Sequence, residues 1–150
     1  MSYHLENRTN EPTLEYMTEK AINILKKNPN GFFLFVEGGK IDMAHHEDKA
    51  HIALDETVEF DKAIEKAYNM TNEKDTLIVV TADHSHTMTM NGYPIRGNNI
   101  LGLFGKSNDS LPYATLSYAN GPGYHEEVAG KRHNLEDDNM STKFLSFRIF

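Results

Sequence analysis

The stretch 32–51, FFLFVEGGKIDMAHHEDKAH, decides how the sequence is organised. It begins with five consecutive apolar residues, 32–36, which are typical of a strand buried in a parallel sheet. Glu37 and two glycines follow, and a helical pattern begins at Asp42. Because Asp42 and His46 stand four residues apart, a helix that starts there places both side chains on one face, where they can bind one cation.

A second strand-like run, TLIVVT at 76–81, repeats this arrangement. It is rich in β-branched residues, and one carboxylate and two imidazoles follow it directly. A helical segment over 44–68 lies between the two runs, so the order strand, helix, strand predicts parallel strands whose carboxyl ends meet at one edge. Open α/β sheets bind ligands at that edge. The residues expected together there are Glu37, Asp42, His46, Asp83 and His84.

Simpler explanations exist for each of these residues taken alone. A single histidine is more often a surface residue than a metal ligand, and glycine beside a carboxylate is also ordinary turn chemistry. Two strand ends that each deliver Asp and His favour a metal site over turn composition. Imidazole and carboxylate ligands without thiolate suit zinc, and an all-oxygen site around Glu37 suits magnesium.

The motifs of this sequence resemble those of the metazoan alkaline phosphatases. VEGGKIDMAHHEDKAH, VVTADHSHT, GYPIRGNNILGL and YANGPGY occur in this order, and the resemblance covers roughly residues 11–130. It implies an α/β fold, here part of the parallel-sheet sandwich of that family with an inserted small β-rich crown segment. It further implies a homodimeric hydrolase of phosphate monoesters with two zinc ions and one magnesium ion. The family is extracellular and attached to the cell surface by a glycolipid anchor.

The resemblance assigns a metal-binding role to five residues. Glu37 matches the carboxylate that binds magnesium. Asp42 and His46 match two ligands of the first zinc, and Asp83 and His84 match two ligands of the second zinc.

Four further positions have a counterpart in the family. His86 matches a histidine close to the bound phosphate, and His45 lies within the motif without being a direct ligand. Met43 stands where many vertebrate members have histidine. Glu11 matches a carboxylate of a peripheral calcium site, although the helix dipole also favours an acidic residue near a helix start.

The resemblance places several catalytic groups outside these 150 residues. The nucleophilic serine, its neighbouring aspartate and the phosphate-binding arginine would precede Met1, and the last zinc histidine would follow Phe150. The sequence therefore predicts an alkaline phosphatase fragment that is inactive alone, and a truncated gene model or read-through into non-coding sequence is the hypothesis for its ending. Two alternatives stay open: a non-catalytic metal-binding remnant or interaction fragment, and a related phosphodiesterase or sulfatase.

Three parts are expected along the chain. Residues 1–90 belong to the α/β metal-binding catalytic domain, residues 91–134 form the crown-like insertion, and residues 135–150 form a divergent tail. Within the insertion, the strand-like runs 100–104 and 114–118 are separated by turns rich in Asn and Gly.

Helical patterns precede the insertion. The first begins at Glu11-Pro12 and stops at Asn30-Gly31. The charges of the helix after Asp42, among them Glu56 and Glu59, are expected on a solvated face. Because two central strands make a thin sheet with exposed edges, the isolated chain is expected to be unstable.

Composition excludes some functions. A net charge of −7 and a pI of about 5.6 argue against nucleic-acid binding, which needs a basic surface. No apolar run has the length of a membrane span, and neither a signal peptide nor an anchor signal is found in the sequence. The absence of cysteine excludes disulfides within the chain. Glycosylation sequons begin at Asn7, Asn69, Asn108 and Asn139.

Overall fold

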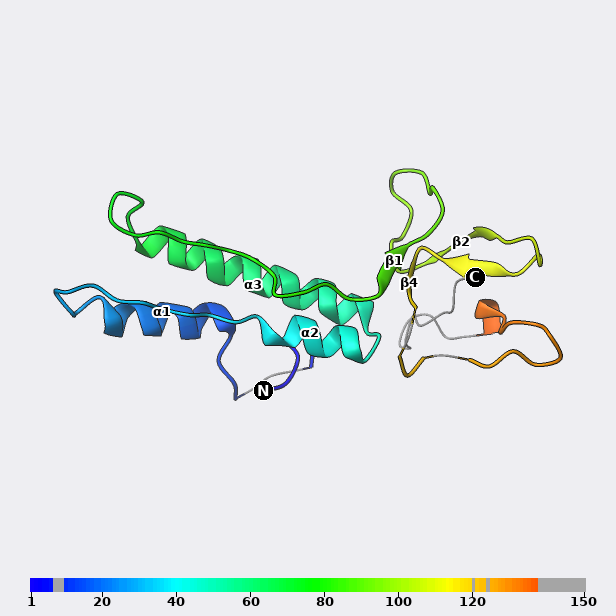
Figure 1. Ribbon diagram of the computed structural model, residues 1–150, viewed down its shortest axis with the longest axis horizontal. Helices are drawn as coiled ribbons and strands as arrows, with labels where there is room; N and C mark the ends of the chain where they lie inside the picture. The colour runs from blue at the N-terminus through cyan, green and yellow to red at the C-terminus, as the bar shows by residue number, and fades with distance from the viewer. Residues whose placement is uncertain (7–9, 120, 124, 138–150) are drawn as a thin grey trace. The chain divides into compact units, whose positions relative to one another are not determined.

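The computed structural model describes residues 1–6, 10–119, 121–123 and 125–137 (Figure 1). The sequons at Asn7 and Asn139 and most of the expected tail lie outside these residues. The chain divides into two compact units: unit 1 comprises Met1–Asp42 and Ile52–His84, and unit 2 comprises Met43–His51 and the described residues from Ser85 onward. The elements in chain order are α1 (Leu14–Leu25), α2 (Gly39–His46), α3 (Ala50–Met70), β1 (Met88–Met90), β2 (Leu103–Lys106), β3 (Pro112–Ala114), β4 (Leu116–Tyr118) and the 3₁₀ helix η1 (Leu135–Asp137).

Helix α1 of unit 1 is shorter than the sequence pattern predicted. It begins after Thr13, whose hydroxyl accepts a hydrogen bond from the Tyr16 N–H at 3.1 Å. A threonine in this position satisfies one of the amides that a helix start leaves without a partner. The helix therefore starts after Glu11-Pro12, and it ends at Leu25, before Asn30-Gly31.

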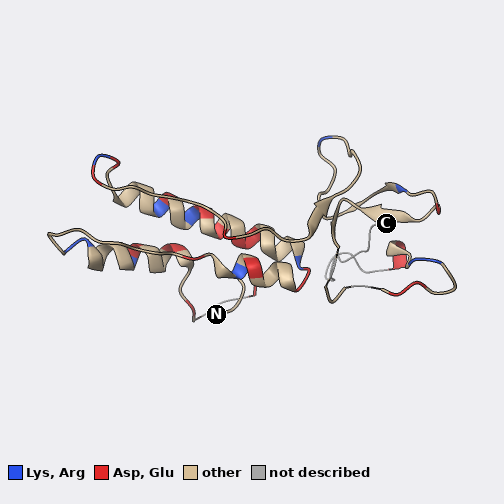
Figure 2. Cartoon of the chain, viewed as in Figure 1, with Lys and Arg blue, Asp and Glu red and all other residues tan. Residues whose placement is uncertain are grey.

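Ion pairs join helices α1 and α3 at their surface. The Lys66 ammonium lies 3.0 Å from Glu15 and 3.6 Å from Glu19. Figure 2 shows acidic and basic residues spread along both helices. Exposed ion pairs contribute less than about 1 kcal/mol each, so the buried Ile22 of α1 and Ala63 of α3 contribute more to stability.

The two runs predicted as buried parallel strands are not strands in this structure. Residues 32–36 and 76–81 belong to neither of the sheets in the described part of the chain, and a parallel sheet is not confirmed. Phe33 and Leu77 are each 87% exposed. Over residues 33–36 and 76–79 exposed side chains alternate with partly buried ones, which is the period of an extended chain with one face covered. A central strand needs hydrogen-bonding neighbours on its edges and a layer on each face.

Two acidic residues of α3 that were predicted on a solvated face are buried instead. Glu56 accepts a hydrogen bond from the backbone N–H of His4 at 2.6 Å. The His4 ring lies 2.8 Å from Asp55 and 3.6 Å from Glu59. The N-terminal segment therefore covers this part of α3, which the periodicity of α3 alone cannot reveal.

The predicted helix over 44–68 is interrupted between α2 and α3. Asp48 has a φ of 57°, a left-handed conformation that glycine most often adopts at a helix end. Its N–H donates to the His45 carbonyl at 3.1 Å, and the Lys49 N–H donates to the Ala44 carbonyl at 2.9 Å. These two bonds form a Schellman motif, which ends α2 and turns the chain into α3.

Unit 2 contains two small antiparallel sheets. Strands β1 and β4 pair with Met88 opposite Tyr118 and Met90 opposite Leu116. Strands β2 and β3 pair with Phe104 opposite Tyr113, and the register shifts at Gly105. Strand β4 is buried along its length. The strand-like runs 100–104 and 114–118 thus correspond to β2 and β4 with shifted bounds, and β3 lies between them.

Candidate metal centre

Helix α2 brings the first candidate ligands together. A Cβ at Gly38 would lie 3.1 Å from the Phe60 ring, so a larger residue there would crowd the turn that precedes the helix. The helix starts at Gly39, earlier than predicted, and both Asp42 and His46 lie in it four positions apart. The prediction that these two side chains share one helix face is therefore confirmed.

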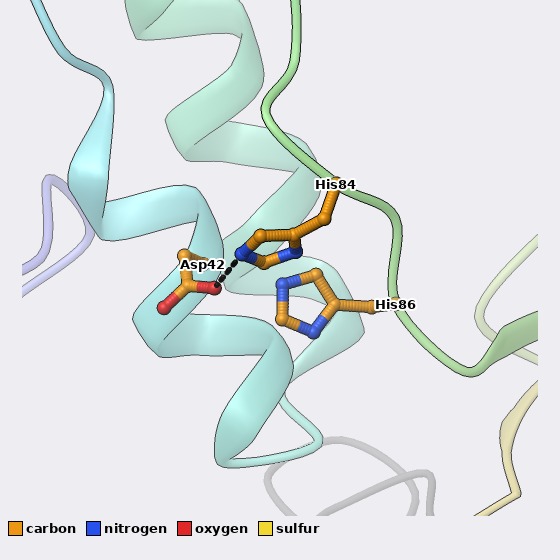
Figure 3. Close-up of side chains that lie close together, drawn as sticks. All are labelled: Asp42, His84 and His86. Carbon is orange, nitrogen blue, oxygen red and sulfur yellow. Dashed lines mark ion pairs between the residues drawn. The ribbon is translucent and has the colours of Figure 1, made fainter.

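Asp42 lies opposite His84 within unit 1. The Oδ1 of Asp42 is 3.5 Å from the Nε2 of His84 (Figure 3). Two ligand atoms of a tetrahedral zinc, each about 2.0–2.1 Å from the ion, lie about 3.3 Å apart. The observed separation is close to this value, so the carboxylate oxygen and the imidazole nitrogen lie near enough to belong to one metal centre.

Asp83 also contacts the imidazole of His84. Its Oδ2 is 3.5 Å from the Nε2 of His84, and its Oδ1 accepts the His84 N–H at 3.0 Å. The Asp83 side chain is 86% exposed. An exposed carboxylate can reorient at little cost, so Asp83 can approach an ion bound by His84.

His86 lies two residues after His84 and adds a second imidazole to this segment of the chain. Asp42, His84 and His86 form a group of three candidate metal ligands, the one such group in the described part of the chain (Figure 3). Carboxylate and imidazole donors are the ones that zinc accepts in sites without thiolate. The residues present therefore fit a zinc ion.

Within unit 2 the ring of His86 is held between two consecutive histidines of α2. It stacks on His45 with ring centroids 4.6 Å apart and an interplanar angle of 25°. It meets His46 edge-on at 5.1 Å and 89°. His45 thus has a packing role that the sequence did not predict, since it was expected only to lie within the motif.

Four of the predicted site residues lie outside the group of three: His46, Asp83, Glu37 and Glu11. Glu37 lines a small pocket of unit 1 together with Glu56 and Glu59. Glu11 accepts a hydrogen bond from the Ser2 N–H at 2.7 Å, and its other oxygen lies 4.0 Å from the chain's amino group. Glu37 thus lines the same pocket as two carboxylates of α3, and Glu11 contacts the N-terminal segment.

Sequence reasoning missed two residues of unit 2 that contact α2. The hydroxyl of Tyr118 lies 2.7 Å from Nδ1 of His45. The Asp48 carboxylate accepts the Gly123 N–H at 3.3 Å. The motif YANGPGY contains both Tyr118 and Gly123, and it was the one available signal, although its Asn120 and Tyr124 lie outside the described residues.

The chain is thus an α/β protein with a candidate metal site, in which its histidine-rich helix and the segment after residue 81 bring carboxylate and imidazole donors together. The family follows from comparison: the family model described as alkaline phosphatase matches residues 1–148. The chain belongs to the alkaline phosphatase family.

Similar curated proteins agree with this assignment. The membrane-bound alkaline phosphatase of Bombyx mori is 49% identical over 141 residues, which are 92% of this chain and 26% of the relative. The tissue-nonspecific isozyme of Rattus norvegicus is 54% identical over 138 residues, 90% of this chain and 26% of the relative. Alkaline phosphatase 4 of Drosophila melanogaster is 47% identical over 144 residues, 93% and 24% of the two chains. These relatives are hydrolases by name, and the chain spans about a quarter of their length.

Of the helices that the structure describes, none combines the length and the apolar character needed to cross a bilayer.

Proposed function

We propose that this chain is the metal-binding part of an extracellular, homodimeric phosphate monoester hydrolase. The observation that carries the proposal is the 3.5 Å separation of Asp42 and His84, residues 42 positions apart in a chain of the alkaline phosphatase family. The name of the silkworm relative describes that protein as membrane-bound, which supports surface attachment of the whole protein through an anchor.

The roles of the ligands are those that the resemblance to the alkaline phosphatases implies. Asp42 and His46 bind one zinc ion, Asp83 and His84 bind a second, and Glu37 binds magnesium through its oxygens. Such cations, when bound, lower the pKa of an attacking hydroxyl and stabilise negative charge on a leaving oxygen.

The protein's own groups orient the substrate. His86 donates a hydrogen bond from its imidazole to an oxygen of the phosphate. The carboxylates balance the cations, so that the site binds a phosphate monoester without a large excess of positive charge. The attacking serine and a phosphate-binding arginine come from parts of the whole protein outside these 150 residues, and the isolated chain therefore binds metal without turnover.

The remaining parts complete the same architecture. Residues 91–134 form the crown, residues 135–150 the divergent tail, and Glu11 a ligand of a peripheral calcium ion. The runs 32–36 and 76–81 join a parallel sheet of the whole protein, and further layers cover their apolar faces. The high exposure of Phe33 and Leu77 supports such a covering layer, because contiguous apolar surface is normally covered.

The test is metal analysis of the purified chain after dialysis against zinc, beside hydrolysis of p-nitrophenyl phosphate at alkaline pH. We expect bound zinc and no turnover. Asp42→Asn and His84→Ala should each lose about half of the zinc, because the two residues belong to different zinc sites. Asp61→Asn, which removes an exposed carboxylate from α3, is the matched control and should bind zinc like the unaltered chain.

Each outcome separates the proposal from its alternatives. Zinc binding that neither Asp42→Asn nor His84→Ala reduces would contradict the ligand assignment. Turnover by the isolated chain would contradict the requirement for a serine and an arginine from elsewhere. The remaining parts of the protein can also be added to the chain. If zinc stays bound and turnover is still absent, the non-catalytic metal-binding remnant is favoured.

A further inference from the structure

The hydroxyl of Tyr118 is a fixed point at the end of β4. The residue is 1% exposed, and pairing of β4 with Met88 in β1 holds its backbone in place. Its hydroxyl lies 2.7 Å from Nδ1 of His45, with the two rings tilted at 59° and 5.8 Å apart. A hydrogen bond at Nδ1 determines how an imidazole is rotated about the bond to its Cβ and which nitrogen carries the proton.

The ring of His45 also contacts the ring of His86. Because His86 stacks on His45 at 4.6 Å, the plane of His45 sets the plane of His86. The ring of His46 contacts His86 edge-on, with the two ring centroids 5.1 Å apart. Tyr118, His45 and His86 therefore form a chain of contacts that runs from a buried strand to a candidate functional imidazole.

We propose that Tyr118 is a positioning residue for His86 and acts through His45. The tyrosine holds the His45 ring by its Nδ1, and the His45 ring in turn supports the face of His86. This role deepens the proposed function on which it rests, because an imidazole that binds phosphate or metal must be held in one orientation before its ligand arrives.

Two features of unit 2 support this role. Burial, with a smaller effect of the Asp48 carboxylate, raises the pKa of Tyr118 to about 12. The hydroxyl thus keeps its proton, and its hydrogen bond, under alkaline conditions in which ordinary tyrosines ionise. Asp48 also binds the Gly123 N–H, so the end of α2 is attached to the segment after β4 at a second point.

The decisive variant is Tyr118→Phe in the 150-residue chain, because it removes one oxygen and keeps the buried ring. Tyr113→Phe is its matched control: Tyr113 lies in β3 of the same unit and packs edge-on against Phe104. Histidine-labelled NMR spectra of the metal-free chain report the ring orientation directly. We expect the ring signals of both His45 and His86 to shift in Tyr118→Phe and to stay in place in Tyr113→Phe.

Cobalt binding, followed by its visible absorption, provides a second readout. We expect Tyr118→Phe to weaken cobalt binding about tenfold, the usual effect of removing a group that orients a ligand, whereas Tyr113→Phe leaves it unchanged. His45→Ala should have a similar effect, and Tyr118→Phe should add nothing to it if the tyrosine acts through His45.

The outcomes also separate this inference from the proposed function. The positioning role would be overturned if the His86 ring signals did not change in Tyr118→Phe. It would also be overturned if Tyr118→Phe and His45→Ala weakened cobalt binding additively. An unaltered chain that binds no cobalt would contradict the proposed metal site, and the metal-free spectra would still decide whether Tyr118 orients His86.

Discussion

The carboxylate of Asp48 accepts a hydrogen bond from the backbone N–H of Gly123 at 3.3 Å, across 75 positions of the sequence. Asp48 is buried, and its backbone adopts the left-handed conformation that ends α2. An aspartate here is more strained than glycine, but it supplies the acceptor for a backbone donor. The side chain thus stabilises the contact between the end of α2 and the segment after β4.

Replacement of Asp48 should separate these two effects. We expect Asp48→Ala to destabilise the chain by about 1–3 kcal/mol, because the Gly123 N–H loses its acceptor and alanine remains strained at positive φ. Asp48→Gly should be less harmful by about 1 kcal/mol, since glycine adopts this conformation freely. Urea unfolding followed by circular dichroism measures both. Equal stabilities of the two variants would contradict the backbone assignment.

Gly121 is expected to tolerate no side chain. A Cβ at this position would overlap the Asp48 carboxylate, and its φ is +111°. Gly130 has a φ of +71° with nothing within 4 Å of its Cβ position, so Gly130→Ala measures the backbone cost alone, about 1–2 kcal/mol. We expect Gly121→Ala to cost more than Gly130→Ala in the same unfolding experiment. The double variant Asp48→Gly/Gly121→Ala should recover the difference, and failure to recover it would show that Asp48 is not the obstacle.

Arg132 should make the stability of unit 2 depend on acid pH. Its guanidinium binds both oxygens of Asp109 and the carbonyls of Leu111 and Pro112. The hydrogen bond from Arg132 lowers the pKa of Asp109 below its ordinary value. The pair therefore contributes stability above the pKa of an unfolded aspartate, about 3.9, and this contribution is lost as the pH falls through the lowered pKa.

The test is the urea midpoint measured over this acid range. We expect the loss of stability to be smaller in Arg132→Gln than in the unaltered chain, because the variant has already lost the pair. Lys131→Gln removes the adjacent exposed cation and should keep the full dependence. The same acid dependence in Arg132→Gln would exclude the Asp109 pair as its source.

Tyr118 should affect stability at the opposite end of the pH scale. Since its pKa in the folded chain is about 12 and an unfolded tyrosine ionises near 10, the unfolded state loses the proton first. The contribution of this group is fully present below about pH 10 and is lost as the pH rises towards 12. In Tyr118→Phe this part of the alkaline dependence should disappear. In a titration followed by tyrosinate absorbance, one of the seven tyrosines should ionise last. If Tyr118→Phe leaves this last step unchanged, the raised pKa does not belong to Tyr118.

The local motifs of the candidate centre could be predicted because they depend on short spacing. Asp42 and His46 lie on one face of α2 because a helix repeats about every four residues, whatever surrounds it. The family resemblance was likewise recognisable from four motifs, and the match over residues 1–148 confirms it. Helix starts were less accurate, since Thr13 and Gly39, rather than Pro12 and Asp42, mark them.

Features that depend on distant partners could not be predicted in this way. Residues 32–36 and 76–81 have the composition of buried strands, yet Phe33 and Leu77 are exposed, because strand pairing is decided by neighbours and not by the run itself. The burial of Glu56 depends on the backbone of His4, 52 positions away.

The sequence by itself determined the family, the ligand chemistry and the four-residue spacing of α2, because residue type and helical period act over a few positions. Only the tertiary structure decided that α2 ends at a buried aspartate, that Asp42 lies opposite His84, and that Tyr118 contacts the histidine on which His86 stacks. These contacts join residues 41 to 75 positions apart, and a pattern of neighbouring residues carries no information about such distant pairs. Packing and burial select them once the chain has folded.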